Sequence, residues 1–242
     1  MDRIALVTGS THNMGQATAE TLSKDGFHVI VTSRHEDEAR KVSEQLTKKG
    51  SYYAVDFSET DQIEGFFTFI KEKFGRLDVL VNSLAYTENE SILNCTLDIW
   101  EYTLKVNLRS YFLCTKYAAE IMKNQGGGCI VNMTVSSTRG VKDKFSYIVS
   151  KGGIKYMTMA AALDLAPFNI RVNAVGSGQV GTPVGNKDFP ERKRPYVMPS
   201  IPAGHAGDPF DVANAISFLV SEKANYIYGA MLPVDGGMDI KL

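Results

Sequence analysis

The chain has 242 residues, of which 22% are charged and 44% hydrophobic, and its formal net charge is -1. These values are typical of one globular domain with a full core, and the balanced charge argues against nucleic acid or an acidic membrane as a partner. The three cysteines form no CxxC pair, and the four histidines show no HxxxH or HExxH spacing, so neither a disulfide framework nor a metal site is expected. The start of the chain lacks the features of a signal peptide and no stretch is long enough to span a bilayer, so a cytoplasmic location is expected.

Short β-branched runs alternate with longer amphipathic runs along the chain. Strands are predicted at residues 4–7, 28–32, 52–55, 79–81, 129–133, 170–175 and 231–234, and helices at 14–24, 36–48, 61–74, 97–122, 146–165 and 211–220. This alternation predicts an α/β fold: a single doubly wound Rossmann-type domain over residues 1–242, with a parallel sheet of about seven strands and helices on both faces. The Pro- and Gly-rich stretch 176–209 is irregular, and residues 181–209 are expected to form a substrate lid.

A polar turn separates the first predicted strand from the first helix. The backbone N–H groups of such a turn, with the positive end of the helix dipole, suit a phosphate group. The pattern TGxxxNxG places Asn13 where TGxxxGxG has a glycine, and Asn tolerates a positive φ better than most residues. The candidate cofactor-binding residues here are Gly9, Ser10, Thr11, Asn13, Met14 and Gly15.

The second predicted strand ends at Ser33 and Arg34. NAD-binding folds usually carry an acidic residue near this point, which accepts hydrogen bonds from the ribose hydroxyls. A hydroxyl and a guanidinium would instead bind a 2′-phosphate, so the sequence favours NADP(H) over NAD(H). The alternative is that Arg34 is a solvated charge at the start of a polar helix.

Tyr147 and Lys151 lie four residues apart at the start of a predicted helix, and so share one face. A phenol has an ordinary pKa near ~10, and a neighbouring ammonium group should lower that pKa. The pair is therefore suited to move a proton to or from a carbonyl or alcohol oxygen.

Together these motifs resemble the short-chain dehydrogenase/reductase family over nearly the whole chain. Besides the turn and the Tyr–Lys pair, the resemblance rests on Asp56, residues 77–82, Val106-Asn107, residues 171–175, Thr182-Pro183 and residues 234–237. It implies a dimer or tetramer that packs through the long helices at 97–122 and 146–165. The resemblance implies an NADP(H)-dependent oxidoreductase that interconverts a small-molecule carbonyl and a secondary alcohol. The alternatives are an enoyl-type C=C reductase and a non-catalytic NADP(H)-binding protein.

The resemblance also implies roles for individual residues. Tyr147 would be the catalytic acid/base, Lys151 would lower its pKa and hold the nicotinamide ribose, and Asn107 would anchor a proton-relay water. The remaining implied cofactor contacts are Asp56 and Phe57 at the adenine, Asn82, Ser83, Leu84 and Ala85 along the cleft, and Gly178, Val180 and Thr182 at the nicotinamide carboxamide.

One expected residue is missing. The family usually has a Ser at the end of the fifth strand that binds the substrate oxygen, and alignment of that strand places Val135 there. Counting thirteen residues back from Tyr147 gives Thr134 instead, and Ser136 and Ser137 follow. The hydroxyl could therefore come from Thr134 or Ser136, or be absent.

Overall fold

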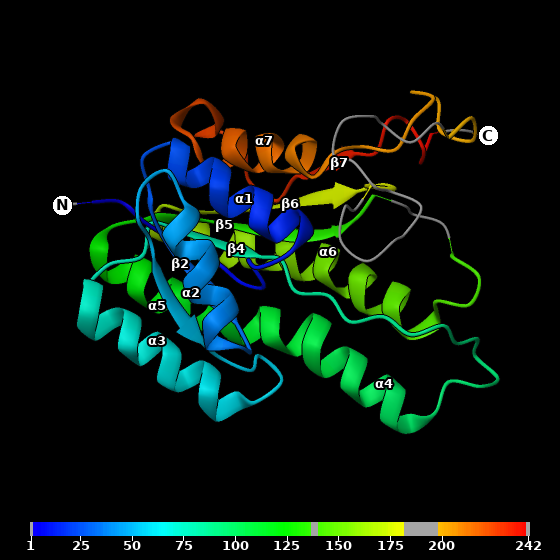
Figure 1. The fold of residues 1–242 in the computed structure, drawn as a ribbon, viewed down its shortest axis with the longest axis horizontal. Helices are drawn as coiled ribbons and strands as arrows, with labels where there is room; N and C mark the ends of the chain where they lie inside the picture. Colours follow the sequence, from blue (N-terminus) through cyan, green and yellow to red (C-terminus); the bar gives the residue numbers. More distant parts are fainter. Residues whose placement is uncertain (1, 137–139, 182–197, 241–242) are drawn as a thin grey trace.

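The computed structural model describes residues 2–136, 140–181 and 198–240. Within them, seven parallel strands form one sheet in the order β3-β2-β1-β4-β5-β6-β7 (Figure 1). The strands are β1 (Ile4–Val7), β2 (His28–Ser33), β3 (Ser51–Ala54), β4 (Val79–Asn82), β5 (Gly128–Val135), β6 (Ile170–Ser177) and β7 (Met231–Val234). The helices are α1 (Asn13–Lys24), α2 (Glu36–Gln45), α3 (Thr60–Phe74), α4 (Leu97–Leu104), α5 (Ser110–Gln125), α6 (Phe145–Leu165) and α7 (Pro209–Val220). The predicted doubly wound fold is confirmed.

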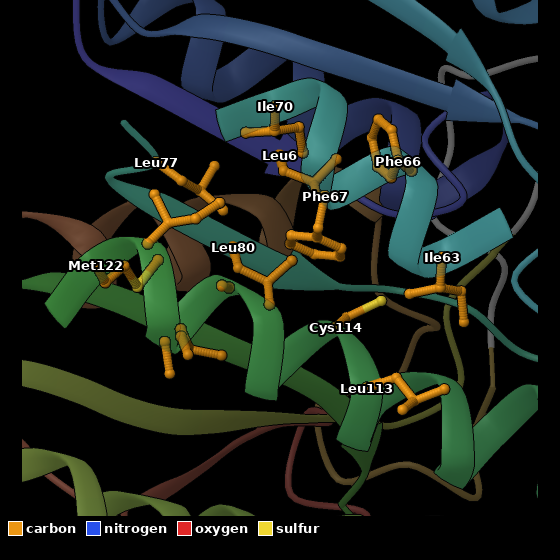
Figure 2. Packing of buried hydrophobic residues seen from close by; sticks show 14 of the residues in the cluster. Leu6, Ile63, Phe66, Phe67, Ile70, Leu77, Leu80, Leu113, Cys114 and Met122 are labelled. Atoms are coloured by element: carbon orange, nitrogen blue, oxygen red, sulfur yellow. The ribbon is translucent and has the colours of Figure 1, made fainter. Parts of the chain in front are cut away.

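The helices form a layer on each face of the sheet, because buried strand residues point alternately to the two faces. Ala5 and Val7 of β1 belong to the core shared with α1, α2 and α7. Ile4 and Leu6 belong to the opposite core, shared with α3, α5 and α6. Figure 2 shows this second core, in which Phe67 of α3 points toward Leu80 of β4.

The largest difference from the predicted elements lies in the segment 97–122. It is not one regular helix: α4 ends at Leu104, a π-helical turn spans Lys105–Arg109, and α5 begins at Ser110. Apolar periodicity alone does not reveal such a turn, because residues on both sides of it remain helical. The turn carries Asn107, one of the predicted site residues.

The other boundaries differ by a few residues. α2 ends at Gln45, three residues before the predicted end, and the chain then passes close to β2. A Cβ at Gly50 would lie 2.4 Å from the carbonyl oxygen of Val29, so the chain needs glycine at this approach. β5 and β6 extend to Val135 and Ser177, and this brings the predicted site residues to the carboxyl edge of the sheet.

None of the helices in the described ranges is long and apolar enough to cross a membrane. Across the same ranges, no group of three or more His, Cys, Asp or Glu side chains is arranged to hold a metal ion.

Candidate functional site

A cleft of about 480 Å³ lies at the carboxyl ends of β1, β2, β3 and β4. Most of the predicted cofactor residues line it: Gly9, Thr11, Asn13, Met14, Gly15, Ser33, Arg34, Asp56, Phe57, Ser83, Leu84 and Ala85. The lining also includes residues that were not predicted as cofactor contacts, among them His12, His35, Glu38, Tyr86 and Tyr102. A crevice outside the carboxyl ends of parallel strands is where open α/β sheets bind ligands.

The turn after β1 forms the floor of the cleft with little room for side chains. Gly9 has a φ of +64°, and a Cβ there would lie 3.0 Å from Cδ2 of Leu84. A Cβ at Gly15 would lie 2.3 Å from the carbonyl oxygen of Gly9. Both positions therefore need glycine, which leaves the backbone of the turn open to a ligand in the cleft.

Ser10 has a different place from the other turn residues. Its side chain is fully buried, and its hydroxyl accepts a hydrogen bond from the backbone N–H of Thr32 at 2.8 Å. Ser10 is not among the residues that line the cleft. Its contribution is to fix the turn against β2, and sequence position alone does not distinguish this from contact with a ligand.

Asn13 bears out the tolerance expected of it, since its φ is +50°. Its side-chain Oδ1 is buried and has no hydrogen-bond partner among the described residues. A buried acceptor without a partner costs free energy unless a donor meets it. The glycine turn leaves space in the cleft for a ligand against its backbone, and Asn13 Oδ1 is an unpaired buried acceptor at the edge of that turn.

The far end of the cleft carries charges of both signs. Arg34 is exposed and has no ion pair or hydrogen bond within the described part of the chain. Glu38, one turn into α2, accepts a hydrogen bond from the Ser33 hydroxyl at 2.9 Å. The end of β2 carries no carboxylate, but α2 supplies one through Glu38. The sequence indicates this only by acidic residues in the first turn of that helix.

Asp56 and Phe57 follow β3 and line the same end of the cleft. Asp56 Oδ1 accepts from the backbone N–H of Ser58 at 2.8 Å, which shapes the loop. Phe57 is 4% exposed and packs edge-on against Phe66 of α3 at 6.1 Å between ring centroids. The hydrophobic core thus supports this side of the cleft.

Asn82 and Asn107 are fully buried and hold the segment after β4 in place. Asn82 donates from Nδ2 to Oδ1 of Asn132 at 2.8 Å, and it does not line the cleft. Asn107 accepts from the backbone N–H of Tyr86 at 2.7 Å and donates to the carbonyl of Tyr86 at 2.8 Å. A further bond of 3.0 Å to the hydroxyl of Ser150 connects this segment to α6. Asn107 therefore joins three elements of the site.

Tyr147 and Lys151 lie one turn apart in α6. Tyr147 is partly buried, and its hydroxyl has no hydrogen-bond partner among the described residues. Nζ of Lys151 lies 5.8 Å from the centroid of the Tyr147 ring. Neither residue is among those that line the cleft around the turn.

Burial decides how both groups titrate. It lowers the pKa of Lys151, which is 3% exposed, from 10.5 to about 7. It also raises the pKa of Tyr147 above its ordinary value of 10.0. The sequence-based prediction that the pKa of Tyr147 is lowered is therefore wrong for the protein alone, because removal of the phenolate from water outweighs an ammonium that is itself close to losing its proton.

Neither hydroxyl proposed to replace the missing Ser is exposed. Thr134 donates to the carbonyl oxygen of Lys151 at 2.8 Å, inside the protein. Ser136 is fully buried, and its hydroxyl lies near the carboxylate of Asp235 without the geometry of a hydrogen bond to any described residue. Val135 is the partly exposed residue of this group. Ser137 lies outside the described residues.

Gly178 and Val180 follow β6 and do not line the cleft around the turn. A Cβ at Gly178 would lie 2.6 Å from Cβ of Asp235, so the close approach of the chain after β7 requires glycine. Val180 forms an isolated bridge with Gly207. Thr182 lies outside the described residues, as does most of the predicted lid 181–209.

Known proteins resemble this chain over nearly its whole length. A family model described as enoyl-(acyl carrier protein) reductase matches residues 9–239. The chain is 34% identical to the 3-oxoacyl-[acyl-carrier-protein] reductase FabG of Thermotoga maritima, over 98% of both chains. It is also 34% identical to an NAD-dependent glycerol dehydrogenase of Listeria innocua, over 99% of this chain and 95% of the relative.

Two solved structures share the fold across the full length of the chain. Acetoin dehydrogenase YohF from Salmonella typhimurium has a TM-score of 0.92 and 29% identity, and covers 100% of this chain and 98% of its own. ElxO with NADP bound has a TM-score of 0.91 and 28% identity, and covers 100% of both chains.

Proposed function

Because this chain belongs to the short-chain dehydrogenase/reductase family, we propose that it is an NADP(H)-dependent oxidoreductase that interconverts a carbonyl and a secondary alcohol on a small molecule. The observation that supports this most directly is the Tyr147 hydroxyl. It is partly buried, has no partner among the described residues, and lies one turn from Lys151 at the carboxyl edge of the sheet. A phenol so placed is available to a substrate oxygen.

The cleft offers a place for each part of the cofactor. The turn residues Gly9, Thr11, Asn13, Met14 and Gly15 would hold the pyrophosphate, and Ser33 and Arg34 would hold the 2′-phosphate. Asp56 and Phe57 would flank the adenine, and Ser83, Leu84 and Ala85 would line the path toward the nicotinamide. Ser10 and Asn82 would not touch the cofactor, but would hold the lining segments in place through their buried hydrogen bonds. Gly178, Val180 and Thr182 would contact the carboxamide group of the nicotinamide.

The cofactor, when bound, supplies or accepts the hydride, and the protein handles the proton. In the reducing direction the Tyr147 hydroxyl donates its proton to the carbonyl oxygen while hydride adds to the carbonyl carbon. Because burial raises the pKa of Tyr147, the phenol keeps its proton at neutral pH, which suits reduction. Lys151, with a pKa of about 7, exchanges protons readily at neutral pH and would return one toward Tyr147 through the segment that Asn107 anchors.

The experiment has two arms. Purified protein is titrated with NADPH and NADH by fluorescence or calorimetry, and turnover is measured with a panel of ketones and secondary alcohols. We expect Tyr147→Phe to abolish turnover while cofactor binding stays within about twofold, because only the proton donor is lost. Unchanged turnover removes Tyr147 from the mechanism, and failure to bind either coenzyme overturns the proposed function. Tight binding without turnover on any substrate would indicate a non-catalytic NADP(H)-binding protein.

A second candidate reaction is reduction of a conjugated C=C bond. The description of the matching family model, enoyl-(acyl carrier protein) reductase, favours it. So does Val135, because the family's usual hydroxyl for a carbonyl substrate is absent at that position. Paired assays with a 2-enoyl thioester and a 3-oxoacyl thioester of the same chain length separate the two reactions.

We also propose that the chain assembles as a dimer or tetramer through α5 and α6. These helices expose large apolar side chains, including Phe112 (52%), Tyr156 (71%) and Leu163 (78%). Large apolar side chains exposed on neighbouring helices are typical of an interface. Light scattering coupled to size exclusion tests the proposal, and a Leu163→Glu variant should shift the mass toward the monomer.

A further inference from the structure

Tyr111 of α5 is fully buried and is the largest side chain buried to this degree. It lies one helical turn after Asn107, directly beneath the segment that follows β4. Its hydroxyl donates to the carbonyl oxygen of Leu84 at 2.8 Å and lies 3.2 Å from that of Met133. A buried phenol needs such partners, but these two carbonyls have a second neighbour.

That neighbour is Nζ of Lys151. It lies 3.1 Å from the carbonyl oxygen of Leu84, 3.3 Å from that of Met133 and 3.4 Å from the hydroxyl oxygen of Tyr111. Nζ is also 5.1 Å from the centroid of the Tyr111 ring. Among the described residues, Lys151 forms no ion pair with a carboxylate.

The direction of these bonds matters for the charge on Lys151. The Tyr111 proton points to a carbonyl, so an oxygen lone pair is left to face Nζ. A lysine ammonium has three donors and no acceptor, and the cluster offers three acceptors. A neutral amine would leave one acceptor unmatched and would bring its own lone pair toward oxygen atoms. The cluster therefore favours the protonated form.

We propose that Tyr111 is a positioning residue for Lys151: its hydroxyl supplies the third acceptor that holds Nζ in place and stabilises its positive charge beside Tyr147. The inference rests on the proposed function only for its effect on catalysis. The cluster of Tyr111, Lys151 and the two carbonyls is a feature of the protein alone.

In the described ranges, the other side chains around Lys151 carry no charge that could balance its ammonium group. The titratable neighbours are Tyr111 and Cys114 on α5 and Tyr147 on α6, while β5 and the segment after β4 contribute backbone carbonyls. Burial raises the pKa of Tyr111 and of Cys114 well above their ordinary values, so both are neutral at neutral pH. Dipoles rather than a counter-charge must therefore support the ammonium, and the Tyr111 hydroxyl is the side-chain dipole in contact with it.

The test uses the protein without cofactor. The lysine Cε and Nζ signals of isotope-labelled protein are titrated by NMR, and Lys151 is assigned by loss of its signal in Lys151→Met. Tyr111→Phe keeps the ring and removes the acceptor, so we expect the titration midpoint of Lys151 to fall by about one pH unit. The matched control is Tyr117→Phe, which removes a hydroxyl from the same helix and should leave the midpoint unchanged.

A second variant protects the test against misfolding. Site-specific 3-fluorotyrosine at position 111 preserves the volume but weakens the oxygen as an acceptor, and should lower the midpoint by a smaller amount in the same direction. A midpoint that stays the same or rises in Tyr111→Phe, or with 3-fluorotyrosine should Tyr111→Phe not fold, overturns the proposal.

A second experiment measures the effect of Tyr111 on catalysis. In Tyr111→Phe, loss of positive charge beside Tyr147 should move the acidic limb of the pH profile for alcohol oxidation to higher pH, while Tyr117→Phe keeps the profile of the parent. A shifted Lys151 midpoint in protein that has no turnover would support the positioning role and contradict the proposed function. An unshifted Lys151 midpoint in protein that turns over substrate would contradict the positioning role of Tyr111 and support the proposed function.

Discussion

Ser33 donates a hydrogen bond of 2.9 Å to Glu38 across the end of the cleft, next to the exposed guanidinium of Arg34. The carboxylate and the guanidinium therefore act in opposite senses on a 2′-phosphate. Glu38 would repel that phosphate, or accept from a ribose hydroxyl in its place, whereas Arg34 would attract it. Preference between the two coenzymes depends on the balance of these residues.

Glu38→Gln should therefore strengthen NADPH binding by about fivefold without strengthening NADH binding, because the variant removes one negative charge close to the 2′-phosphate and leaves only a weaker, neutral acceptor for a ribose hydroxyl. Calorimetric or fluorescence titration measures both constants. The control is Glu36→Gln, an exposed position on the same helix that does not line the cleft. The same small gain for both coenzymes in Glu38→Gln would show that the carboxylate does not sense the phosphate.

Arg34 is tested in the opposite direction. Replacement of Ser33 by Asp together with Arg34→Ala should shift preference toward NAD(H), because the pair then carries the acceptor that ribose hydroxyls need. If the unmodified protein already binds NADH more tightly than NADPH, the prediction from Ser33 and Arg34 is wrong, and Glu38 is the dominant residue.

Val135→Ser should raise kcat/KM for carbonyl reduction by about tenfold. One donor to the developing oxyanion is typically worth on the order of 100- to 1,000-fold, and a donor introduced by substitution recovers part of that. Val135→Ala is the control, since it opens the same space without a hydroxyl. Equal rates in the two variants would mean that size rather than hydrogen bonding limits turnover.

Lys151→Met should stabilise the protein below pH 7. The pKa of Lys151 is lowered to about 7 in the folded state, so between that pH and 10.5 the unfolded chain binds more protons and the free energy of unfolding rises with pH. Below pH 7 the full cost of burying the ammonium is present, and its removal should raise the free energy of unfolding by about 5 kcal/mol. Urea unfolding at pH 6 and pH 9 tests this, and a difference between variant and parent that does not shrink at pH 9 would contradict it.

Glu90 should be needed for the start of α6. Its side chain is 2% exposed and accepts from the backbone N–H of Ser146 at 2.9 Å, in the first turn of the helix that carries Tyr147. Glu90→Ala should lower the free energy of unfolding by about 2 kcal/mol through loss of this cap, and should reduce turnover. Glu101→Gln, on the exposed face of α4, serves as the control and should change stability little.

The central strands were predicted well because they are buried on both faces and read as continuous apolar runs, as in β1. Ile4–Val7 and Met231–Val234 have the predicted bounds. Most turn residues of the cofactor site were likewise predictable, since backbone approach demands glycine at Gly9 and Gly15.

Features that depend on contacts between distant elements were not predictable. Ser10 and Asn82 have the residue types of ligand contacts, but their partners on neighbouring strands turn them inward. Glu38 reaches the cleft from a helix whose acidic first turn looks like ordinary capping. From the sequence, Tyr111 is indistinguishable from the other core residues of α5, because its contact with Lys151 depends on the fold.

The π-helical turn at Lys105–Arg109 accommodates one extra residue between α4 and α5. Deletion of a single residue there would restore an uninterrupted α-helix and rotate everything on one side of it by about 100° relative to the other. Asn107 would then lose Tyr86, or Tyr111 would lose Lys151, because a regular helix has no register that satisfies both. The one-residue insertion therefore sets the rotation at which Asn107 meets Tyr86 and Tyr111 meets Lys151.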